Sequence, residues 1–255
     1  MAICTTTRPI ARSPPPGPCH WQNSGQYQNS PCHEQGRLRS RALDSLSATY
    51  PVLAAVAAYL LGSLSFAVIV SRVMGLNDPR SYGSKNPGAT NVLRSGSRKA
   101  AVLTLLLDGA KGWLPVALVQ WYGKPYGLEA GTVALVGLGA FLGHLYPVFF
   151  RFEGGKGVAT AAGVLLGVHW ALGLATLGTW VIIALFFRYS SLAALVAAVF
   201  APLYYIFGDG LAWYMEGAVL FTVSLMSLLL IYRHAENIGR LARGVETRLG
   251  QKKKP

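Results

Sequence analysis

The sequence predicts an all-α polytopic membrane protein with seven transmembrane helices, and three observations lead to this fold class. Hydrophobic residues make up 52% of the 255 residues and charged residues only 13%, with a mean hydropathy of +0.38. The apolar residues form long runs, as in chains that cross a bilayer. Basic residues gather in alternate connections between the runs, which is how cytoplasmic loops are marked.

Seven apolar segments can be marked along the chain. They are approximately Pro51–Val73, Ala100–Tyr122, Ala130–Phe150, Val158–Val168, Trp170–Phe187, Leu192–Phe207 and Ala212–Tyr232. The fourth and fifth segments meet at His169, and together they would make a run of about 30 residues, which is long for one helix across a core about 30 Å thick. We therefore expect a tight pair of helices there.

The charges of the connections set the expected orientation. The basic connections are 72–99, 151–156, the single residue Arg188 and the tail from Arg233. The connections between them carry Lys124 with Glu129, His169, and Asp209 with Glu216. If basic connections lie in the cytoplasm, the alternation requires seven helices, with the N-terminus outside and the C-terminus inside.

The first 47 residues differ from the rest of the chain. They are rich in Pro, Ser, Thr, Gln and Arg and have no apolar run, so we expect a disordered extension over 1–47, a membrane domain over 48–249 and a basic cytoplasmic tail over 250–255. Arg37, Arg39 and Arg41 oppose an outside N-terminus. A physiological start near 43–46 at a non-Met codon would resolve this, and N-terminal sequencing that finds Met1 would contradict it.

Composition also excludes several kinds of site. Cys4, Cys19 and Cys32 all precede the first apolar segment, so the membrane body has no cysteine nucleophile and no cysteine-type zinc site, and we expect no metal and no cofactor. The net charge of +13 is spread between apolar segments. We therefore expect the basic residues to face the cytoplasm and anionic lipid of the bilayer and expect no nucleic-acid partner.

Three glycine-flanked lysines carry the functional signal: Gly83–Gly88, Gly109–Gly112 and Gly154–Gly157. Glycine lets backbone N–H groups approach a ligand and lysine adds positive charge, which together suit a phosphate group at a membrane surface. In Gly154, Gly155, Lys156 and Gly157 we favour an anion cradle over a flexible turn with a topogenic lysine. It is not a Walker A loop, since Gly157 stands where that loop needs Ser or Thr.

The loop that begins at Gly83 offers hydroxyl, amide, ammonium and guanidinium groups. They belong to Ser84, Lys85, Asn86, Asn91 and Arg94. Arg94 can hold a phosphate with two hydrogen bonds, and the asparagines add further polar contacts. Alone, this stretch reads as a polar loop with an Asn-Pro-Gly turn, but beside the other loops we favour a substrate site.

Ionisable residues within or beside the apolar segments complete the candidate set. Asp108 and Lys111 are three residues apart on one helix face, so a functional role and a structural ion pair are equally supported. His234 and Asn237 share that spacing, and with Glu246 nearby we favour a role for His234 as proton carrier or phosphate donor. His144 is a weaker candidate that could simply join two helices.

The same residues leave three classes of function open: an enzyme, an anion transporter and a lipid-binding scaffold. No activated nucleophile is evident, because no serine sits in a Gly-x-Ser-x-Gly motif and no histidine is followed by aspartate at the His-x4-Asp spacing. An enzyme of this kind would need an intrinsically activated substrate. A transporter would need polar groups near the midplane, where only Asp108 and Lys111 are found.

From about Tyr50 to Leu249 the chain resembles the bacterial acyl-phosphate:glycerol-3-phosphate acyltransferase family (PlsY). Three stretches carry the resemblance in order: 83–94, 143–160 and 232–246. The second stretch, which contains Gly143-His144-Leu145-Tyr146-Pro147 and Gly154-Gly155-Lys156-Gly157, is the most specific. Lys85 stands where many relatives have glycine, and Glu153 where lysine is common.

The resemblance implies a bacterial inner-membrane enzyme whose active site faces the cytoplasm. It would transfer a fatty acyl group from acyl phosphate to the 1-hydroxyl of glycerol 3-phosphate, giving lysophosphatidic acid and phosphate without acyl-CoA or acyl carrier protein. It also implies functional coupling to the enzyme that makes acyl phosphate. The implied site residues are Ser84, Arg94, Lys156 with the Gly154–Gly157 backbone, His234 and Asn237, with Glu246 in a structural role.

Overall fold

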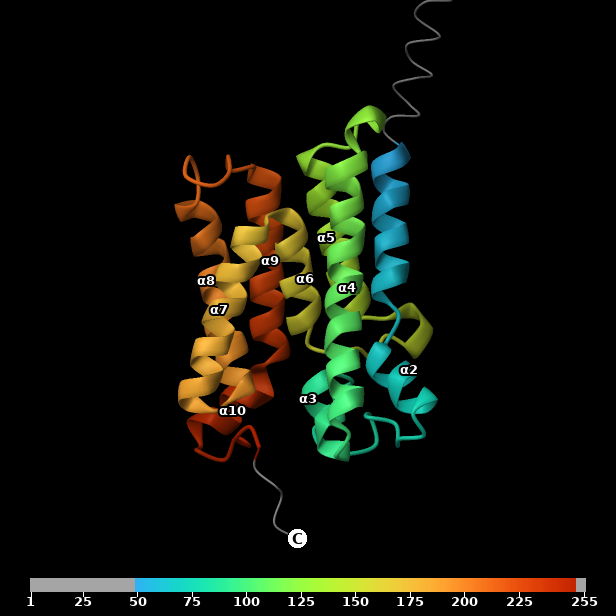
Figure 1. The fold of residues 1–255 in the computed structure, drawn as a ribbon, viewed down its shortest axis with the longest axis vertical. Coiled ribbons are helices and arrows are strands. Elements are labelled where there is room, and N and C mark those ends of the chain that lie inside the picture. Colours follow the sequence, from blue (N-terminus) through green and yellow to red (C-terminus); the bar gives the residue numbers. More distant parts are fainter. Residues whose placement is uncertain (1–48, 251–255) are drawn as a thin grey trace, which may run out of the picture. The chain divides into compact units, whose positions relative to one another are not determined.

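The computed structural model describes residues 49–250, which form helices joined by short connections and contain no β-strand (Figure 1). The all-α class is therefore confirmed for the described residues. The predicted disordered extension over 1–47 and, apart from Gly250, the predicted basic tail lie outside this range.

The helices follow the apolar segments. They are a first helix Thr49–Gly62, then α2 (Phe66–Val73), α3 (Ala89–Val92), α4 (Arg98–Tyr122), α5 (Ala130–Leu145), α6 (Val158–Val168), α7 (Trp170–Phe187), α8 (Ser190–Phe207), α9 (Gly217–Arg233) and α10 (Ala235–Ala242). Short 3₁₀ turns lie at Leu93–Ser95, Lys124–Tyr126 and Val148–Phe150.

The number of possible membrane spans among the described helices is four to six, where the sequence predicts seven. The helices α4, α7 and α8 and the stretch Ala130–Phe150 are long and apolar enough to cross alone. The first helix with α2 and α9 with α10 qualify only as pairs, bent by 42° and 56°. The 11 residues of α6 rise only about 16 Å, which is too short for a core of about 30 Å.

Two predicted segments differ most from the observed helices, one by an internal break and one at its start. The segment Pro51–Val73 is broken between Gly62 and Phe66, where no proline or charge marks the break. In the last predicted segment, α9 begins at Gly217 instead of Ala212, because Trp213 folds back and donates its indole N–H to the carbonyl of Tyr205 at 2.8 Å. The hydropathy of a segment alone does not indicate where the chain folds back in this way.

The expected helix pair within 158–187 is present. Helix α6 ends and α7 begins around His169, whose backbone is extended with φ of −158°. Its imidazole Nδ1 accepts a hydrogen bond from the N–H of Ala171 at 3.3 Å and so caps α7. The break therefore has a local cause in the side chain of His169.

Close glycine contacts place α6 against α4, between the two groups of helices that Figure 1 shows. A Cβ atom on Gly163 would lie 2.0 Å from the carbonyl oxygen of Gly109, and one on Gly112 would lie 2.2 Å from that of Thr160. Backbones approach this closely only where side chains are absent, as is common between membrane helices. This contact sets α6 against the part of α4 that contains Asp108 and Lys111.

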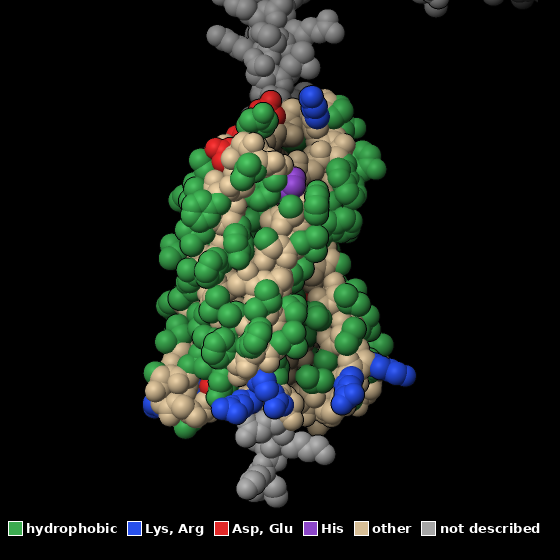
Figure 2. Space-filling view, turned by 60° about the vertical axis from the view of Figure 1, so that its left-hand side comes forward, with side chains coloured by type: hydrophobic (Ala, Val, Ile, Leu, Met, Phe, Trp, Pro, Cys, Tyr) green, Lys and Arg blue, Asp and Glu red, His purple; other side chains and the backbone are tan. Residues whose placement is uncertain are grey.

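Apolar side chains cover the sides of the helices, whereas basic side chains gather at one end (Figure 2). Phe186, for example, is 82% exposed and Leu185 is 73% exposed. In water such a surface would be an aggregation hazard, but it matches the hydrocarbon of a bilayer.

Candidate active site

The loop Gly154–Gly157 enters the helix bundle just before α6. The Gly155 N–H donates to the carbonyl of His144 at 3.1 Å, and the Arg233 guanidinium donates to the carbonyls of Gly154 at 2.8 Å and Gly155 at 3.2 Å. Gly157 has a φ of +84°, and a Cβ there would lie 2.4 Å from the ring of Phe141. Glycine is therefore required by close packing, beyond the flexibility of a turn.

The start of α6 presents positive potential beside this loop. No side chain caps its first N–H groups, because the cap residue is Gly157. Free N–H groups and the helix dipole favour an anion at this position. The geometry thus suits the anion cradle that the sequence predicts.

Lys156 points from this loop to the third sequence stretch. Its ammonium donates to the side-chain oxygen of Asn237, and the Asn237 amide in turn donates to a Glu246 carboxylate oxygen at 2.6 Å. The pKa of Lys156 is lowered to about 8, mainly by burial and to a smaller extent by repulsion from Arg240. An anion bound at this site would favour the charged form of the lysine.

Glu246 holds α8 and α10 together. Its carboxylate accepts hydrogen bonds from Asn237, from Arg240 of α10 at 2.6 Å and from Ser191 of α8 at 2.8 Å. Burial alone would raise the pKa of Glu246, but these three hydrogen bonds outweigh it and the pKa is lowered. Glu246 therefore supports Asn237 as an ionised carboxylate.

His234 lies at the bend between α9 and α10 and is 3% exposed. Its Nδ1 is 2.8 Å from the carbonyl of Leu230, which can only accept a hydrogen bond. Nδ1 therefore carries the proton, and in the neutral ring Nε2 is left as an acceptor. Such a nitrogen can accept a hydrogen bond from a substrate hydroxyl.

The loop of Ser84 and Arg94 is organised by Asn91. The Asn91 amide donates to the carbonyls of Pro79 at 2.6 Å and Tyr82 at 3.2 Å, and its oxygen accepts from the Ser84 N–H at 3.0 Å and from Arg94 at 3.4 Å. In this arrangement the buried Asn91 amide holds the loop together and is not presented to a ligand. Ser84 and Arg94 are exposed at its surface.

Lys85 and Asn86 take different places in the same loop. Lys85 is exposed and has a φ of +55°, a left-handed conformation that glycine adopts at less cost. Asn86 is half-buried, and its amide nitrogen would be 3.1 Å from a Cβ on Gly88. The left-handed backbone explains why the position of Lys85 suits glycine.

Contacts join this loop to the Lys156 loop. A Cβ on Gly155 would lie 3.0 Å from the carbonyl oxygen of Pro87. Thr90 Oγ1 and Ser190 Oγ are 3.4 Å apart, next to the Ser191 that donates to Glu246. The three sequence stretches, far apart along the chain, therefore meet at one end of the described helices.

Asp108 and Lys111 form a buried ion pair, with Nζ and Oδ1 2.9 Å apart and side chains 3% and 1% exposed. The Lys111 ammonium also donates at 2.7 Å to the carbonyl of Leu64, which the break after Gly62 leaves without a helical partner. His144 Nδ1 lies 3.6 Å from Asp108 Oδ1. The structural ion pair is thus present. His144 links it to the Gly154–Gly157 loop, because His144 lies beside Asp108 and its carbonyl accepts from the Gly155 N–H.

Sequence reasoning missed the contacts of Arg233, Ser191 and Arg240. The basic Arg233 stood out only as a neighbour of His234, yet it binds two loop carbonyls. Ser190 and Ser191 are two adjacent polar residues at the start of an apolar helix, which was the available signal. The residues that the structure describes contain no group of acidic, histidine or cysteine side chains arranged for a metal ion.

Residues 52–244 match the family described as glycerol-3-phosphate acyltransferase. The glycerol-3-phosphate acyltransferase of Albidiferax ferrireducens is 69% identical over 216 residues, covering 85% of this chain and 96% of the relative. That of Bordetella petrii is 64% identical over 197 residues, covering 77% and 92%.

Two crystal structures are also similar to this chain. Both are of PlsY (YgiH), an integral membrane glycerol 3-phosphate acyltransferase, in its glycerol 3-phosphate and lysophosphatidic acid forms. The TM-scores are 0.72 and 0.71 at 40% and 39% identity, and each covers 79% of this chain and 96% of the other. With a family match that spans the first two sequence stretches and all but the last two residues of the third, this multi-pass membrane chain belongs to the glycerol-3-phosphate acyltransferase family.

Proposed function

We propose that the protein transfers a fatty acyl group from acyl phosphate to the 1-hydroxyl of sn-glycerol 3-phosphate. The products are lysophosphatidic acid and phosphate, which makes this the first step of phospholipid biosynthesis. The observation that carries the proposal is the anion site formed by Lys156, the loop before α6 and the Asn237–Glu246 pair, with His234 alongside. Relatives named for the same activity support it.

The reaction needs no acyl-enzyme, because acyl phosphate already carries a good leaving group. The 1-hydroxyl oxygen attacks the acyl carbonyl carbon, the bond from that carbon to the phosphate oxygen breaks, and phosphate leaves with the electron pair. A phosphate oxygen takes the hydroxyl proton. The enzyme then positions two anionic substrates and stabilises the developing charge, and a trapped acyl-enzyme would contradict this mechanism.

The site residues have distinct proposed roles. Lys156 and the Gly154–Gly157 backbone bind a substrate phosphate, and Asn237 with Glu246 orients the lysine. Arg94 and Ser84 contact the other anionic substrate from the facing loop, with Asn86 and Lys85 at its edge. His234 accepts a hydrogen bond from a glycerol hydroxyl through Nε2. Asn91, Asp108, Lys111 and His144 hold the loops in place.

The proposed setting is a bacterial inner membrane with the site on the cytoplasmic face. The membrane domain over 48–249 would cross seven times if the short α6 counts as one span together with the loop before it. The N-terminus then lies outside and the C-terminus inside. The gathering of basic residues at the site end supports this orientation (Figure 2). There the enzyme would receive acyl phosphate from the enzyme that makes it.

A single assay separates the three classes of function. The purified protein is reconstituted in vesicles and given acyl phosphate and labelled glycerol 3-phosphate, without coenzyme A or acyl carrier protein. Labelled lysophosphatidic acid in the lipid phase is the expected result. Label inside the vesicles without product would instead indicate a transporter, and retention on the protein alone would indicate a binding scaffold.

A further inference from the structure

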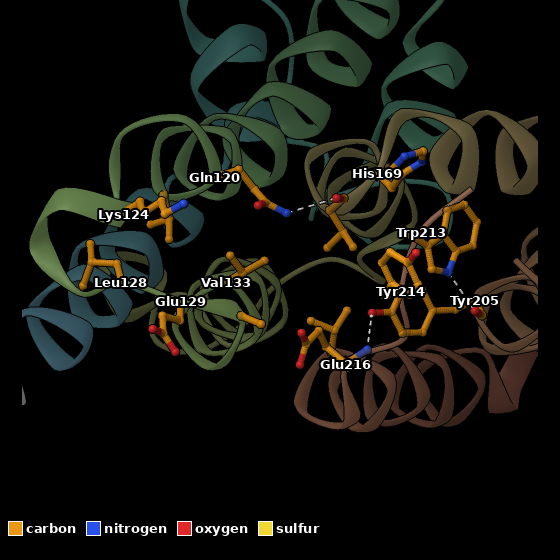
Figure 3. A pocket seen from close by; sticks show the side chains of 14 residues that line it. Gln120, Lys124, Leu128, Glu129, Val133, His169, Tyr205, Trp213, Tyr214 and Glu216 are labelled. Atoms are coloured by element: carbon orange, nitrogen blue, oxygen red, sulfur yellow. Dashed lines mark hydrogen bonds between the residues drawn. The ribbon is translucent and has the colours of Figure 1, made fainter. Parts of the chain in front are cut away.

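A cavity of about 450 Å³ (Figure 3) lies at the end of the described helices opposite the glycine-lysine loops. It is lined by the last turns of α4, the start of α5, the α6–α7 break and the connection from α8 to α9. Because α6 ends at Val168, its neighbours extend beyond it and leave a hollow. The Gln120 amide closes one side by donating to the Val168 carbonyl at 3.1 Å.

Aromatic side chains form one wall of this cavity. Tyr205 and Trp213 stack with ring centres 5.8 Å apart, and His169 lies 4.8 Å from Trp213. The Trp213 indole donates to the Tyr205 carbonyl, and the Tyr205 hydroxyl accepts from the Glu216 N–H at 3.1 Å. These contacts hold the rings in place.

Two carboxylates and one ammonium border the same cavity. Glu129 and Glu216 precede α5 and α9, where the helix dipole favours a negative charge even without a ligand. Yet neither side chain caps its own helix, and within residues 49–250 neither carboxylate has a hydrogen bond or ion pair. Lys124, on the same cavity, likewise has no acidic partner among the described residues. The cavity thus offers both signs of charge.

The surroundings place this cavity at a membrane interface. Large aromatic residues are exposed around it, as in the belts where Trp and Tyr meet lipid headgroups. They are Trp121, Tyr122, Tyr126, Trp170 and Tyr214. A ligand there would have water on one side and acyl chains on the other.

We propose that this cavity binds the headgroup of a zwitterionic aminophospholipid. Its ammonium lies between Glu129 and Glu216, and its phosphate meets Lys124. The acyl chains follow the exposed apolar surface. This site is separate from the acyltransfer site, and its occupancy does not depend on the proposed reaction.

The test is native mass spectrometry of the purified full chain in detergent, titrated with phosphatidylethanolamine or phosphatidylglycerol. We expect the wild type to retain phosphatidylethanolamine more tightly, since phosphatidylglycerol has no ammonium. In the double variant Glu129→Gln/Glu216→Gln the affinity for phosphatidylethanolamine should fall by about tenfold, so that the preference is lost. Glu153→Gln is the matched control, because it removes an exposed carboxylate far from the cavity, and it should behave as wild type.

Three results would overturn the proposal. One is equal retention of the two lipids by the wild type. Another is a preference for phosphatidylethanolamine that persists in the double variant. The third is displacement of the lipid by soluble O-phosphoethanolamine at equal concentration, because this would show that a small amine suffices and that the acyl chains contribute nothing.

Discussion

Lys156 combines three properties at the scale of a single residue. It is partly removed from water, it lies near the positive charge of Arg240, and its ammonium is held by Asn237, 81 residues further along the chain. The first two make its charge costly in the free protein. A phosphate ligand would relieve that cost, so the site gains more from binding an anion than an exposed lysine would.

Removal of this charge should impair glycerol 3-phosphate turnover. We expect Lys156→Ala, and likewise Arg94→Ala, to lower kcat/KM by about 10²–10³-fold, as for other groups that stabilise charge in the transition state. Lys124→Ala is the matched control, since that lysine lies at the opposite end. Steady-state rates with acyl phosphate test this, and near-normal turnover by either variant would contradict its role.

The lowered pKa of Lys156 also predicts a pH dependence. The lysine is charged below its pKa of about 8 and loses its charge as the pH rises through that value. The alkaline limb of the kcat/KM profile should therefore fall near pH 8. In Lys156→Arg the limb should move to higher pH, because a guanidinium stays protonated. Profiles that coincide for the two proteins would assign the limb to another group.

Much of this could be predicted from the residues, and the remainder depends on contacts across the chain. Glycine-flanked lysine predicts an anion site, and the loop before α6 has the geometry for one. The engagement of Asn91 with Pro79 and Tyr82 could not be predicted, because an asparagine can serve a loop or a ligand equally well. Tertiary contacts alone decide between these uses.

At the scale of elements, short and broken helices shape the site. The break after Gly62 exposes the Leu64 carbonyl to Lys111, and the short α6 starts beside Asp108, whose carbonyl accepts from Thr160 Oγ1 at 3.0 Å. Hydropathy located the seven segments, including the short Val158–Val168, but not the break after Gly62, since serine and glycine within an apolar run look unremarkable. The break after Gly62 and the short α6 place the anion loop close to the buried ion pair.

The close packing of the loop predicts the effect of one methyl group. A Cβ on Gly155 would lie 2.2 Å from His144 Nε2, so Gly155→Ala must move the loop. We expect a KM for glycerol 3-phosphate about tenfold higher, with a smaller change in kcat. Gly178→Ala in α7, where no atom lies within 4 Å of the added Cβ, is the control. An unchanged KM would show that the loop does not bind this substrate.

The buried pair of Asp108 and Lys111 predicts a non-additive effect on stability. Lys111→Met leaves a buried carboxylate without its partner and should destabilise the protein by about 3–5 kcal/mol. The double variant Asp108→Asn/Lys111→Met should regain much of this, because no unpaired charge is left. Thermal unfolding of the purified proteins in detergent measures both. Additive losses would show that the two side chains act independently.

At the scale of the whole molecule, the two ends differ in charge and in the kind of site they carry. The glycine-lysine loops and most exposed basic residues share one end, whereas Glu129, Glu216 and an aromatic belt mark the other (Figure 2). Charge alternation along the sequence predicts this division. It follows that the orientation of the chain in the membrane decides which compartment supplies each site.

Cysteine labelling can determine that orientation. The native cysteines Cys4, Cys19 and Cys32 are replaced by serine, and a single cysteine is then placed at Lys99 or Lys124. Both positions are exposed lysines, at opposite ends of α4, so the two substitutions are matched in charge and accessibility. A membrane-impermeant maleimide should label Lys124→Cys in intact spheroplasts and should reach Lys99→Cys only after permeabilisation, because in the proposed orientation the basic end faces the cytoplasm. The reverse pattern would place the acyltransfer site outside the cell, away from any cytoplasmic supply of acyl phosphate, and would therefore contradict both the orientation and the coupling proposed for this enzyme.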